Sequence, residues 1–267
     1  MDLKSAFAFH TTPFTRELST DKLLGFSTHD AARDGICRAI DKRMSAALIA
    51  PPGTGKTTVI RSVMARLPEA RYHLHYVKCT NIGKRDMCRE IARVCDVDSV
   101  GSFSALHQRL QARFEGMLAD QGLRPVLLLD EAHDLRPDVL SMFRLLTNFQ
   151  MDSRLVLSLV FVGQTDLGTL LARDDYDAIA RRIVHYATLR PLSRDETTRY
   201  IEHRCDIAGS RTSPFDSSSI DAIYEIARGN LRATDNLALE SLEGAARATL
   251  KVVSAMHVSA ARKVLWP

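Results

Sequence analysis

The sequence predicts an α/β fold in which a mostly parallel, five-stranded sheet is followed by a small all-helical domain. Apolar strand-like runs alternate with helical patterns five times before Pro191, which is typical of a doubly wound sheet. Beyond Pro191, strand patterns are nearly absent and helical patterns continue. We therefore divide the chain into a lead-in at residues 1–30, an α/β domain at residues 31–191 and a helical domain at residues 192–267.

Within the α/β domain, each expected strand is a short apolar run, and each expected helix carries apolar residues at steps of three and four. The clearest helical stripe consists of Phe103, Leu106, Leu110, Phe114 and Leu118. The expected strands are residues 44–50, 72–79, 126–129, 155–162 and 183–189. The expected helices are residues 28–43, 56–67, 84–95, 103–119, 137–149 and 175–182. In the second domain, Ser193 and Glu196 have the spacing of a capping box that begins a helix, and further helices are expected at 217–228 and 233–250.

The composition is that of a globular protein without a membrane span, and no membrane partner is expected. Hydrophobic residues make up 45% of the 267 positions and charged residues 25%. No apolar run approaches the roughly 20 residues that a membrane-spanning helix needs, and the first ten residues lack the pattern of a signal peptide. We therefore expect a cytoplasmic protein. The five cysteines form no CxxC pair, which argues against a zinc site, and a net charge of +4 is too small to indicate a nucleic-acid partner by itself.

A glycine-rich segment between the first expected strand and the next helix has the composition of a phosphate-binding loop. Its sequence is APPGTGKT, from Ala50 to Thr57. Glycine permits backbone conformations that direct successive amides, and the N-terminus of the following helix, toward an anion. Lys56 is expected to reach the terminal phosphates of a nucleotide, and Thr57 to place its hydroxyl on Mg²⁺. The other expected nucleotide contacts are Pro52, Gly53, Thr54, Gly55 and Thr58. Alanine at position 50 replaces the first glycine of such loops and is the smallest substitute.

Two carboxylates follow the apolar run at 126–129. In an open α/β sheet, ligands bind at the carboxyl ends of the strands. Asp130 is therefore expected to hold Mg²⁺ through water, and Glu131 to orient and activate an attacking water. Alone, the pair is equally consistent with a helix start, where acidic residues are favoured; beside a phosphate loop, the catalytic interpretation is favoured. The letters DEAH at 130–133 also occur in one helicase group, but we expect His133 to be incidental or to couple the site to other elements.

The motifs together resemble the AAA+ ATPases, through PPGTGKT at 51–57, LLLDE at 127–131 and the helical C-terminal domain. Within them the chain is most similar to the bacterial group that contains ExeA-like ATPases and the transposition regulators TniB and TnsC. That similarity rests on FVGQ at 161–164, IARRI at 179–183 and GNLR at 229–232. The resemblance implies ATP and Mg²⁺ as cofactors, ATP hydrolysis, a homo-oligomeric ring or helical filament, and a helical domain that acts as a lid.

The resemblance also implies roles for residues outside the two motifs. Gln164 matches a sensor near the γ-phosphate, with a polar residue that merely ends a strand as the alternative. Arg181 or Arg182 matches the arginine finger, which enters a neighbouring subunit's ATP site so that hydrolysis requires assembly; the alternative is a solvated pair. Arg232 matches a second sensor in the lid, or else forms a lid salt bridge. Phe14 is expected to cover the adenine or to pack in a core.

The resemblance further suggests DNA as a partner. In the transposition regulators the region that corresponds to Lys84 and Arg85 lines the interior of the ring. We therefore expect these two residues to contact phosphates of double-stranded DNA, with Ser102 as a weaker candidate. Backbone contacts of this kind are independent of sequence and sensitive to salt. The alternative is a solvated helix start, because Asp86 and Glu90 interleave with the basic residues.

Three hypotheses for the function follow. The first is an accessory ATPase of DNA transposition, which assembles on target DNA with ATP and recruits a transposase. The second is an ExeA-like secretion component, although such proteins generally carry a transmembrane segment and a peptidoglycan-binding region that we do not find. The third is an assembly switch with little turnover, against which the intact Glu131 argues.

Overall fold

The computed structural model describes residues 3–210 and 212–266, and the chain divides into two compact units. The sheet unit consists of Ser27–Pro51 and Lys56–Leu189. The helical unit consists of Met1–Phe26, Pro52–Gly55 and Arg190–Pro267. Within the described ranges, no helix combines the length and the apolar character that crossing a membrane requires.

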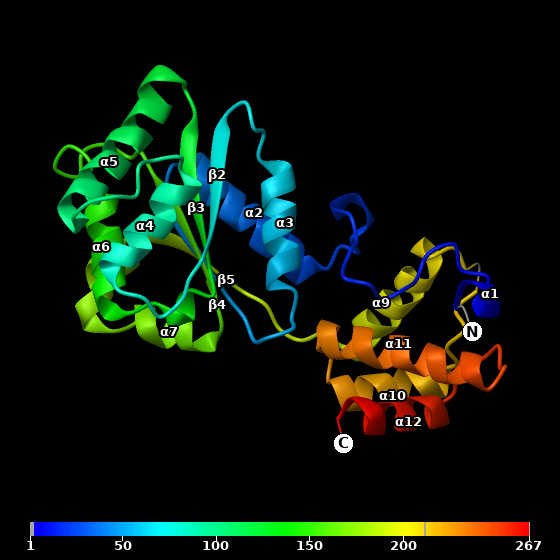
Figure 1. Ribbon diagram of the computed structural model, residues 1–267. Helices are drawn as coiled ribbons and strands as arrows, with labels where there is room; N and C mark the ends of the chain where they lie inside the picture. The colour runs from blue at the N-terminus through cyan, green and yellow to red at the C-terminus, as the bar shows by residue number, and fades with distance from the viewer. Residues whose placement is uncertain (1–2, 211, 267) are drawn as a thin grey trace. The chain divides into compact units, whose positions relative to one another are not determined.

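Five parallel strands form one sheet in the order β2-β3-β4-β1-β5, which confirms the predicted fold class (Figure 1). The strands are β1 (Ser45–Ile49), β2 (Tyr72–Lys78), β3 (Arg124–Asp130), β4 (Ser158–Gly163) and β5 (Ile183–Thr188). Ile49 of β1 lies opposite Gly163 of β4, and Leu129 of β3 lies opposite Phe161. The carboxyl ends of β1, β4 and β3 are therefore neighbours at the C-terminal end of the parallel sheet.

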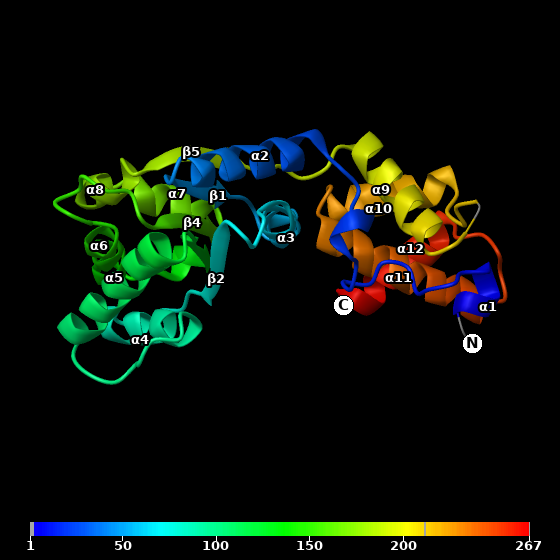
Figure 2. The same ribbon diagram turned by 90° about the horizontal axis from the view of Figure 1, so that it is seen from above.

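Helices cover both faces of the sheet, as Figures 1 and 2 show. Helices α2 (Ser27–Asp41) and α3 (Lys56–Arg66) pack on one face against alternate residues such as Leu48 and Leu128. The opposite face, which includes Leu127, is covered by α4 (Lys84–Val94), α5 (Phe103–Asp120), α6 (Pro137–Leu146), α7 (Thr165–Leu171) and α8 (Asp177–Ala180). Strands buried on both faces explain the continuous apolar runs in the sequence.

The helical unit contains α9 (Arg194–Ile207), α10 (Ser217–Ala227), α11 (Leu231–Arg247) and α12 (Ala255–Leu265). The capping box that begins α9 is present: the Glu196 amide donates to Ser193 Oγ at 3.2 Å, and the Ser193 amide donates to Glu196 Oε2 at 2.7 Å. The core between the helices includes the fully buried side chains of Ile223, Leu237 and Leu242.

The N-terminal residues differ from the expected irregular lead-in at 1–30. They include a short helix, α1 (Leu3–Phe7), and Phe7 and Phe9 are buried in the core of the helical unit. Phe14 is only 3% exposed, and its ring meets the Phe215 ring edge-on with a centroid separation of 5.8 Å. Of the two expectations for Phe14, the structure therefore shows core packing, because the apolar face of this helical unit is large enough to bury it.

Candidate nucleotide site

The glycine-rich loop begins where β1 ends. Pro51 and Pro52 lack the backbone N–H that a strand would need to continue. Gly53 and Gly55 have φ angles of 74° and 98°, in the left-handed region that glycine adopts without steric cost. Lys56 is the first residue of α3, and its ammonium group donates to the carbonyl oxygens of Ala50 at 3.0 Å and Pro51 at 3.1 Å. The lysine thus folds back over the start of the loop, and the N-terminus of α3 directly after the loop is a place where anions are favoured.

Asp130 ends β3, and its carboxylate faces the side of the sheet that α3 covers. Side chains alternate along a strand, so Asp130 shares a face with Leu128, and Leu128 packs in the same cluster as Val59 of α3. Thr57, in the first turn of α3, is exposed. A carboxylate and a hydroxyl are the hard oxygen ligands that Mg²⁺ prefers, and Asp130 lies on the face that α3, the helix of Thr57, covers, so the chemistry of the two residues fits a nucleotide-bound magnesium.

Both oxygens of the Asp130 carboxylate accept a hydrogen bond. The Glu131 amide donates to Oδ1 at 2.9 Å, and the Tyr76 hydroxyl donates to Oδ2 at 2.9 Å. Burial, with the hydrogen bond to Asp130 next, raises the pKa of Tyr76 to about 12, so the phenol is protonated and donating at neutral pH. The sequence did not indicate Tyr76 as a site residue, because a tyrosine in a strand is ordinarily a packing residue.

Glu131 adopts a left-handed backbone conformation, with φ 53° and ψ 37°. Such a conformation is uncommon outside glycine and concentrates at functional sites. His133 Nδ1 lies 3.6 Å from Glu131 Oε2 and accepts a hydrogen bond from the Gln164 amide at 3.4 Å. His133, expected to be incidental or coupling, therefore joins the end of β3 to the end of β4. Gln164 is the N-cap residue of α7, directly after β4, and the strand order puts it between the loop after β1 and Asp130.

Arg181 and Arg182 have different surroundings. The Arg181 side chain is 79% exposed and pairs with Asp177 of α8 at 2.7 Å. The Arg182 side chain is 21% exposed, and its Nη2 atom lies 2.6 Å from each carboxylate oxygen of Asp152. Arg182 Nη1 also reaches the Thr147 carbonyl at 3.5 Å. Arg182 thus holds its own domain together, whereas Arg181 is accessible to another molecule.

Comparison with known proteins agrees with this geometry. Residues 39–171 match the protein family described as AAA domain. Just under half of the chain therefore matches an AAA domain. Over 207 residues it is 30% identical to General secretion pathway protein A of Aeromonas hydrophila, and the match covers 75% of this chain but 37% of that protein. The chain thus spans little more than a third of the length of this relative.

Solved structures share the fold of the AAA domain. Cdc6p of Pyrobaculum aerophilum is 20% identical, with a TM-score of 0.74 that covers 99% of this chain and 71% of that one. ORC1 of Aeropyrum pernix, solved in complex with DNA, is 19% identical, with a TM-score of 0.70 and coverage of 94% and 68%. The RuvB Holliday junction branch migration motor of Thermotoga maritima is 19% identical, with a TM-score of 0.60 and coverage of 94% and 73%. At these identities the likeness establishes the α/β AAA+ fold alone.

Arg232 lies in the helical unit, in the first turn of α11, and is exposed. Its neighbour Asn230 caps this helix by accepting from the Ala233 amide at 3.1 Å, and the Asn230 amide group donates to the Pro52 carbonyl at 2.8 Å within the same unit. A Cβ atom on Gly53 would lie 2.3 Å from Asn230 Oδ1. Gly53 is therefore required both by its left-handed backbone and by the close approach of Asn230. The only sequence feature that could have pointed to Asn230 is its N-cap position in GNLR.

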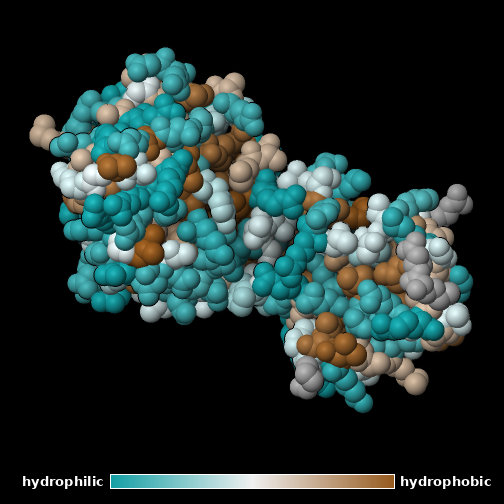
Figure 3. Space-filling model, viewed as in Figure 1, coloured by the Kyte–Doolittle hydropathy of each residue, from teal (hydrophilic) through white to brown (hydrophobic). Residues whose placement is uncertain are grey.

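The three candidate DNA contacts of the AAA domain lie together at the N-terminal ends of α4 and α5. The Lys84 ammonium group is 5.0 Å from the centroid of the Phe103 ring, and Arg85 donates to the Gly101 carbonyl through Nε at 3.2 Å and Nη2 at 3.0 Å. Ser102 caps α5, since its Oγ accepts from the Ala105 amide at 3.3 Å. Neither Lys84 nor Arg85 forms an ion pair with a carboxylate of the described part of the chain. In Figure 3 the surface over α4 and α6 is mostly hydrophilic.

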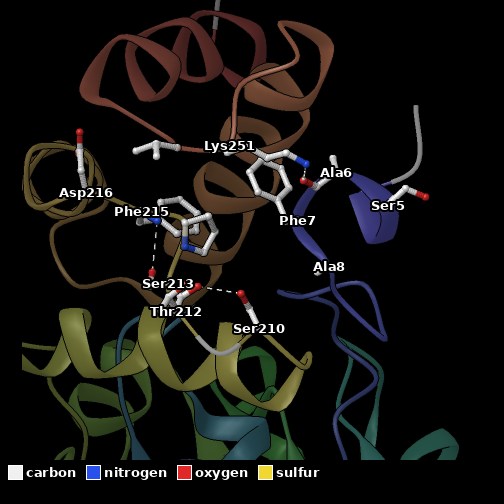
Figure 4. Close-up of a pocket in the computed structure, with 12 residues that line it drawn as sticks. Ser5, Ala6, Phe7, Ala8, Ser210, Thr212, Ser213, Phe215, Asp216 and Lys251 are labelled. Carbon is white, nitrogen blue, oxygen red and sulfur yellow. Dashed lines mark hydrogen bonds between the residues drawn. The ribbon is translucent and has the colours of Figure 1, made fainter.

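A separate pocket of about 510 Å³ lies in the helical unit. Figure 4 shows Lys251 beside Ala6 in this pocket, where the ammonium group donates to the Ala6 carbonyl at 2.6 Å. The lining combines apolar side chains such as Phe7 and Phe215 with serine and threonine hydroxyls. None of the site residues expected from the sequence lines it.

Proposed function

We propose that the protein is a Mg²⁺-dependent ATPase that hydrolyses ATP at the carboxyl ends of β1, β4 and β3. The observation that carries this proposal is that three neighbouring strands end in the Lys56 loop, Gln164 and the Asp130–Glu131 pair. Each of these residue types has a distinct part in phosphoryl transfer, which depends mainly on positioning and electrostatic stabilisation.

The proposed mechanism assigns one task to each side chain. Lys56 and the loop amides bind the β- and γ-phosphates, while Thr57 and Asp130 hold Mg²⁺, which offsets negative charge on the phosphate oxygens when it is bound. Glu131 orients the attacking water and accepts its proton. Gln164 contacts the γ-phosphate region from the adjacent strand, with Thr54 and Thr58 completing the nucleotide contacts, and Arg232 keeps the second-sensor role that the resemblance of GNLR implies.

The proposed arginine finger is Arg181. It is exposed, and the carboxylate that it contacts, Asp177, is only four residues earlier on the same surface helix. Such an exposed pair contributes little to stability and is easily exchanged for a stronger anionic partner. The two-oxygen contact of Arg182 with Asp152 favours Arg181 over Arg182 for this role. Hydrolysis would then require a homo-oligomer, as a ring or a helical filament.

We further propose that this oligomer forms on double-stranded DNA and recruits a transposase. The grouping of Lys84, Arg85 and Ser102 supports a surface for DNA phosphates, because two cations that form no ion pair among the described residues lie beside a polar helix N-terminus. The solved complexes of ORC1 from Aeropyrum pernix and of ORC from Drosophila with DNA are consistent with it, since both share the fold. The transposase partner rests on the resemblance of FVGQ, IARRI and GNLR to the transposition regulators.

An alternative is an ATPase of a secretion pathway that does not act on DNA. The similarity to General secretion pathway protein A of Aeromonas hydrophila favours it. A transposase gene beside the gene for this protein would support the first role, and a cluster of secretion genes would support the second.

Electron microscopy of the purified protein with duplex DNA tests the DNA role directly. With a non-hydrolysable ATP analogue we expect rings or filaments along the DNA, and without nucleotide or with Lys56→Ala we expect bare DNA. Nucleotide-dependent oligomers that ignore DNA would reject the DNA role and retain the ATPase. Absence of nucleotide binding by calorimetry would reject both.

A further inference from the structure

Tyr76 is the one tyrosine whose hydroxyl touches a residue of the proposed site in the described structure. It lies on β2, at an edge of the sheet, with 46% of its surface exposed. Its partner in the register is Leu128, so Asp130 is its diagonal neighbour on the same face of β3. Diagonal neighbours are within reach of an aromatic side chain, and the tyrosine hydroxyl uses this reach to donate to Asp130 Oδ2 at 2.9 Å.

The backbone holds this diagonal contact in place. The Cys79 amide donates to the Asp130 carbonyl at 2.7 Å, one step beyond the pairing of Lys78 with Asp130. The end of β2 is therefore fixed to the end of β3 by the main chain. The main chain therefore sets the separation of the two residues, which the phenol spans with its hydrogen bond to the carboxylate.

The two hydrogen bonds on Asp130 leave room for a metal-bound water. A carboxylate oxygen has two lone pairs, so Oδ1, which accepts from Glu131, and Oδ2, which accepts from Tyr76, each retain one. Hydrogen bonds of this kind fix the orientation of a ligating carboxylate, and their loss typically weakens metal affinity by about 10- to 100-fold.

We propose that Tyr76 is a positioning residue for magnesium: its hydroxyl holds the Asp130 carboxylate in the orientation that takes a nucleotide-bound Mg²⁺. The inference rests on the proposed Mg²⁺-dependent nucleotide site and adds a residue from the sheet edge to it. The proposed role of Tyr76 also means that β2, the strand that precedes Lys84 and Arg85 in the chain, has a direct contact with the proposed metal site.

The test measures metal affinity separately from catalysis. Mn²⁺ replaces Mg²⁺, and its binding to the protein with a non-hydrolysable ATP analogue is followed by electron paramagnetic resonance. Tyr76→Phe removes only the hydroxyl, and we expect Mn²⁺ affinity to fall about 10-fold, the lower end of the range for such partners. Affinity for a fluorescent nucleotide in the presence of EDTA should stay unchanged, because the substitution leaves the phosphate loop intact.

Tyr72→Phe is the matched control. Tyr72 lies on the same strand and its hydroxyl donates to Asp41 at the same distance of 2.9 Å, at the opposite end of β2. This variant loses an equivalent hydrogen bond and should keep wild-type Mn²⁺ affinity. In an Asp130→Asn background, Tyr76→Phe should have no further effect on metal affinity.

The outcomes separate the two proposals. Equal Mn²⁺ affinity in wild type and Tyr76→Phe, or tighter binding in the variant, would overturn the inference on Tyr76 and leave the nucleotide site standing. If the wild-type protein binds nucleotide equally well with and without a divalent metal, the proposed Mg²⁺-dependent ATPase site is rejected. Loss of metal affinity in Tyr72→Phe as well would assign the effect to β2 stability, which also overturns the inference.

Discussion

Arg182 directs Nη2 at both carboxylate oxygens of Asp152, at 2.6 Å each, while the preceding residue, Arg181, has 79% of its side chain exposed. Two adjacent arginines that are equivalent in the sequence therefore have separate tasks in the fold. Arg182 links the start of β5 to the turn after α6, and Arg181 projects from the end of α8.

The first prediction concerns these arginines. Arg181→Ala should lower kcat for ATP by about 10³-fold or more, because an arginine supplied in trans contributes on that order to phosphoryl transfer. Nucleotide affinity should remain within about twofold of wild type. Arg182→Ala should instead lower the free energy of unfolding by about 1 kcal/mol or less, because the half-exposed Asp152 loses its charged partner but remains solvated.

Mixing two inactive variants shows whether Arg181 acts in trans. Glu131→Gln subunits lack the catalytic carboxylate but supply the arginine, and Arg181→Ala subunits keep the carboxylate. Combined in one oligomer, they should recover a measurable part of the activity, at interfaces where the two complement each other. If the mixture stays as inactive as its components, Arg181 acts within its own subunit or not at all.

The second prediction concerns the phosphate loop and the carboxylate at the end of β3. Lys56→Ala should abolish ATP binding, because the loop loses its only charged contact to the terminal phosphates. Glu131→Gln should bind ATP with near wild-type affinity and remain assembled, with turnover lowered by at least about 10²-fold. Isothermal calorimetry and phosphate release check the two parts. Wild-type turnover by Glu131→Gln would disprove the catalytic assignment.

The third prediction concerns DNA. Removal of charge in Lys84→Ala/Arg85→Ala should weaken binding to duplex DNA irrespective of sequence, and should reduce the slope of log affinity against log salt by roughly 2, about 0.9 for each lost phosphate contact. The control is Arg38→Ala/Lys42→Ala, which removes the same charge from exposed positions at the end of α2. Fluorescence anisotropy at several salt concentrations measures both. An equal loss in the two double variants would indicate a general charge effect without a defined surface.

Much of the α/β unit could be predicted because its strands are buried on both faces and its helices carry regular apolar stripes. The helix expected at 103–119 begins and nearly ends where α5 does, since Ser102 caps it and the stripe faces one core. The strand expected at 155–162 begins later, at Ser158, because the pairing with β3 starts there, and Val156 and Leu157 are buried apolar residues that lie outside the sheet.

The elements that were missed are those without a local pattern. Helix α7 has only seven residues, and α1 has five, too few for a periodicity to be recognised. Helix α12 follows the last expected helix after a short turn and exposes Met256 and Val264, so its apolar positions do not form one stripe.

The site residues divide in the same way. Lys56, Asp130 and Glu131 follow from motifs in which local spacing specifies the geometry. The contact of Tyr76 with Asp130 and that of Asn230 with Pro52 could not be predicted, because the two partners of each contact are more than fifty positions apart and only the strand pairing or the unit's packing brings them together.

The fourth prediction concerns acid stability and the capping box of α9. The Arg190 guanidinium donates to both oxygens of Glu196 at 2.7 and 3.0 Å, and together with the hydrogen bonds from Ser193 it lowers the pKa of that carboxyl from its ordinary value of 4.5 to about 2, in opposition to burial. Because the folded pKa lies below the unfolded one, the ionised carboxylate stabilises the folded state above about pH 4.5, and this contribution is lost as the pH falls toward 2. Glu196→Gln keeps a side chain of the same shape with one acceptor oxygen for the Ser193 amide, and removes the charge together with the second acceptor.

We therefore expect Glu196→Gln to lower the free energy of unfolding by about 2 kcal/mol at pH 7, which is typical of a hydrogen bond to a charged group, and by much less near pH 3. Urea unfolding of wild type and variant at both pH values gives the two differences. Asp195→Asn is the control, because the adjacent Asp195 side chain is 91% exposed and makes only a 3.9 Å contact with Arg194. A Glu196→Gln deficit that is the same at pH 3 and pH 7 would show that the side chain stabilises α9 through its shape and hydrogen-bonding capacity, with no contribution from its charge.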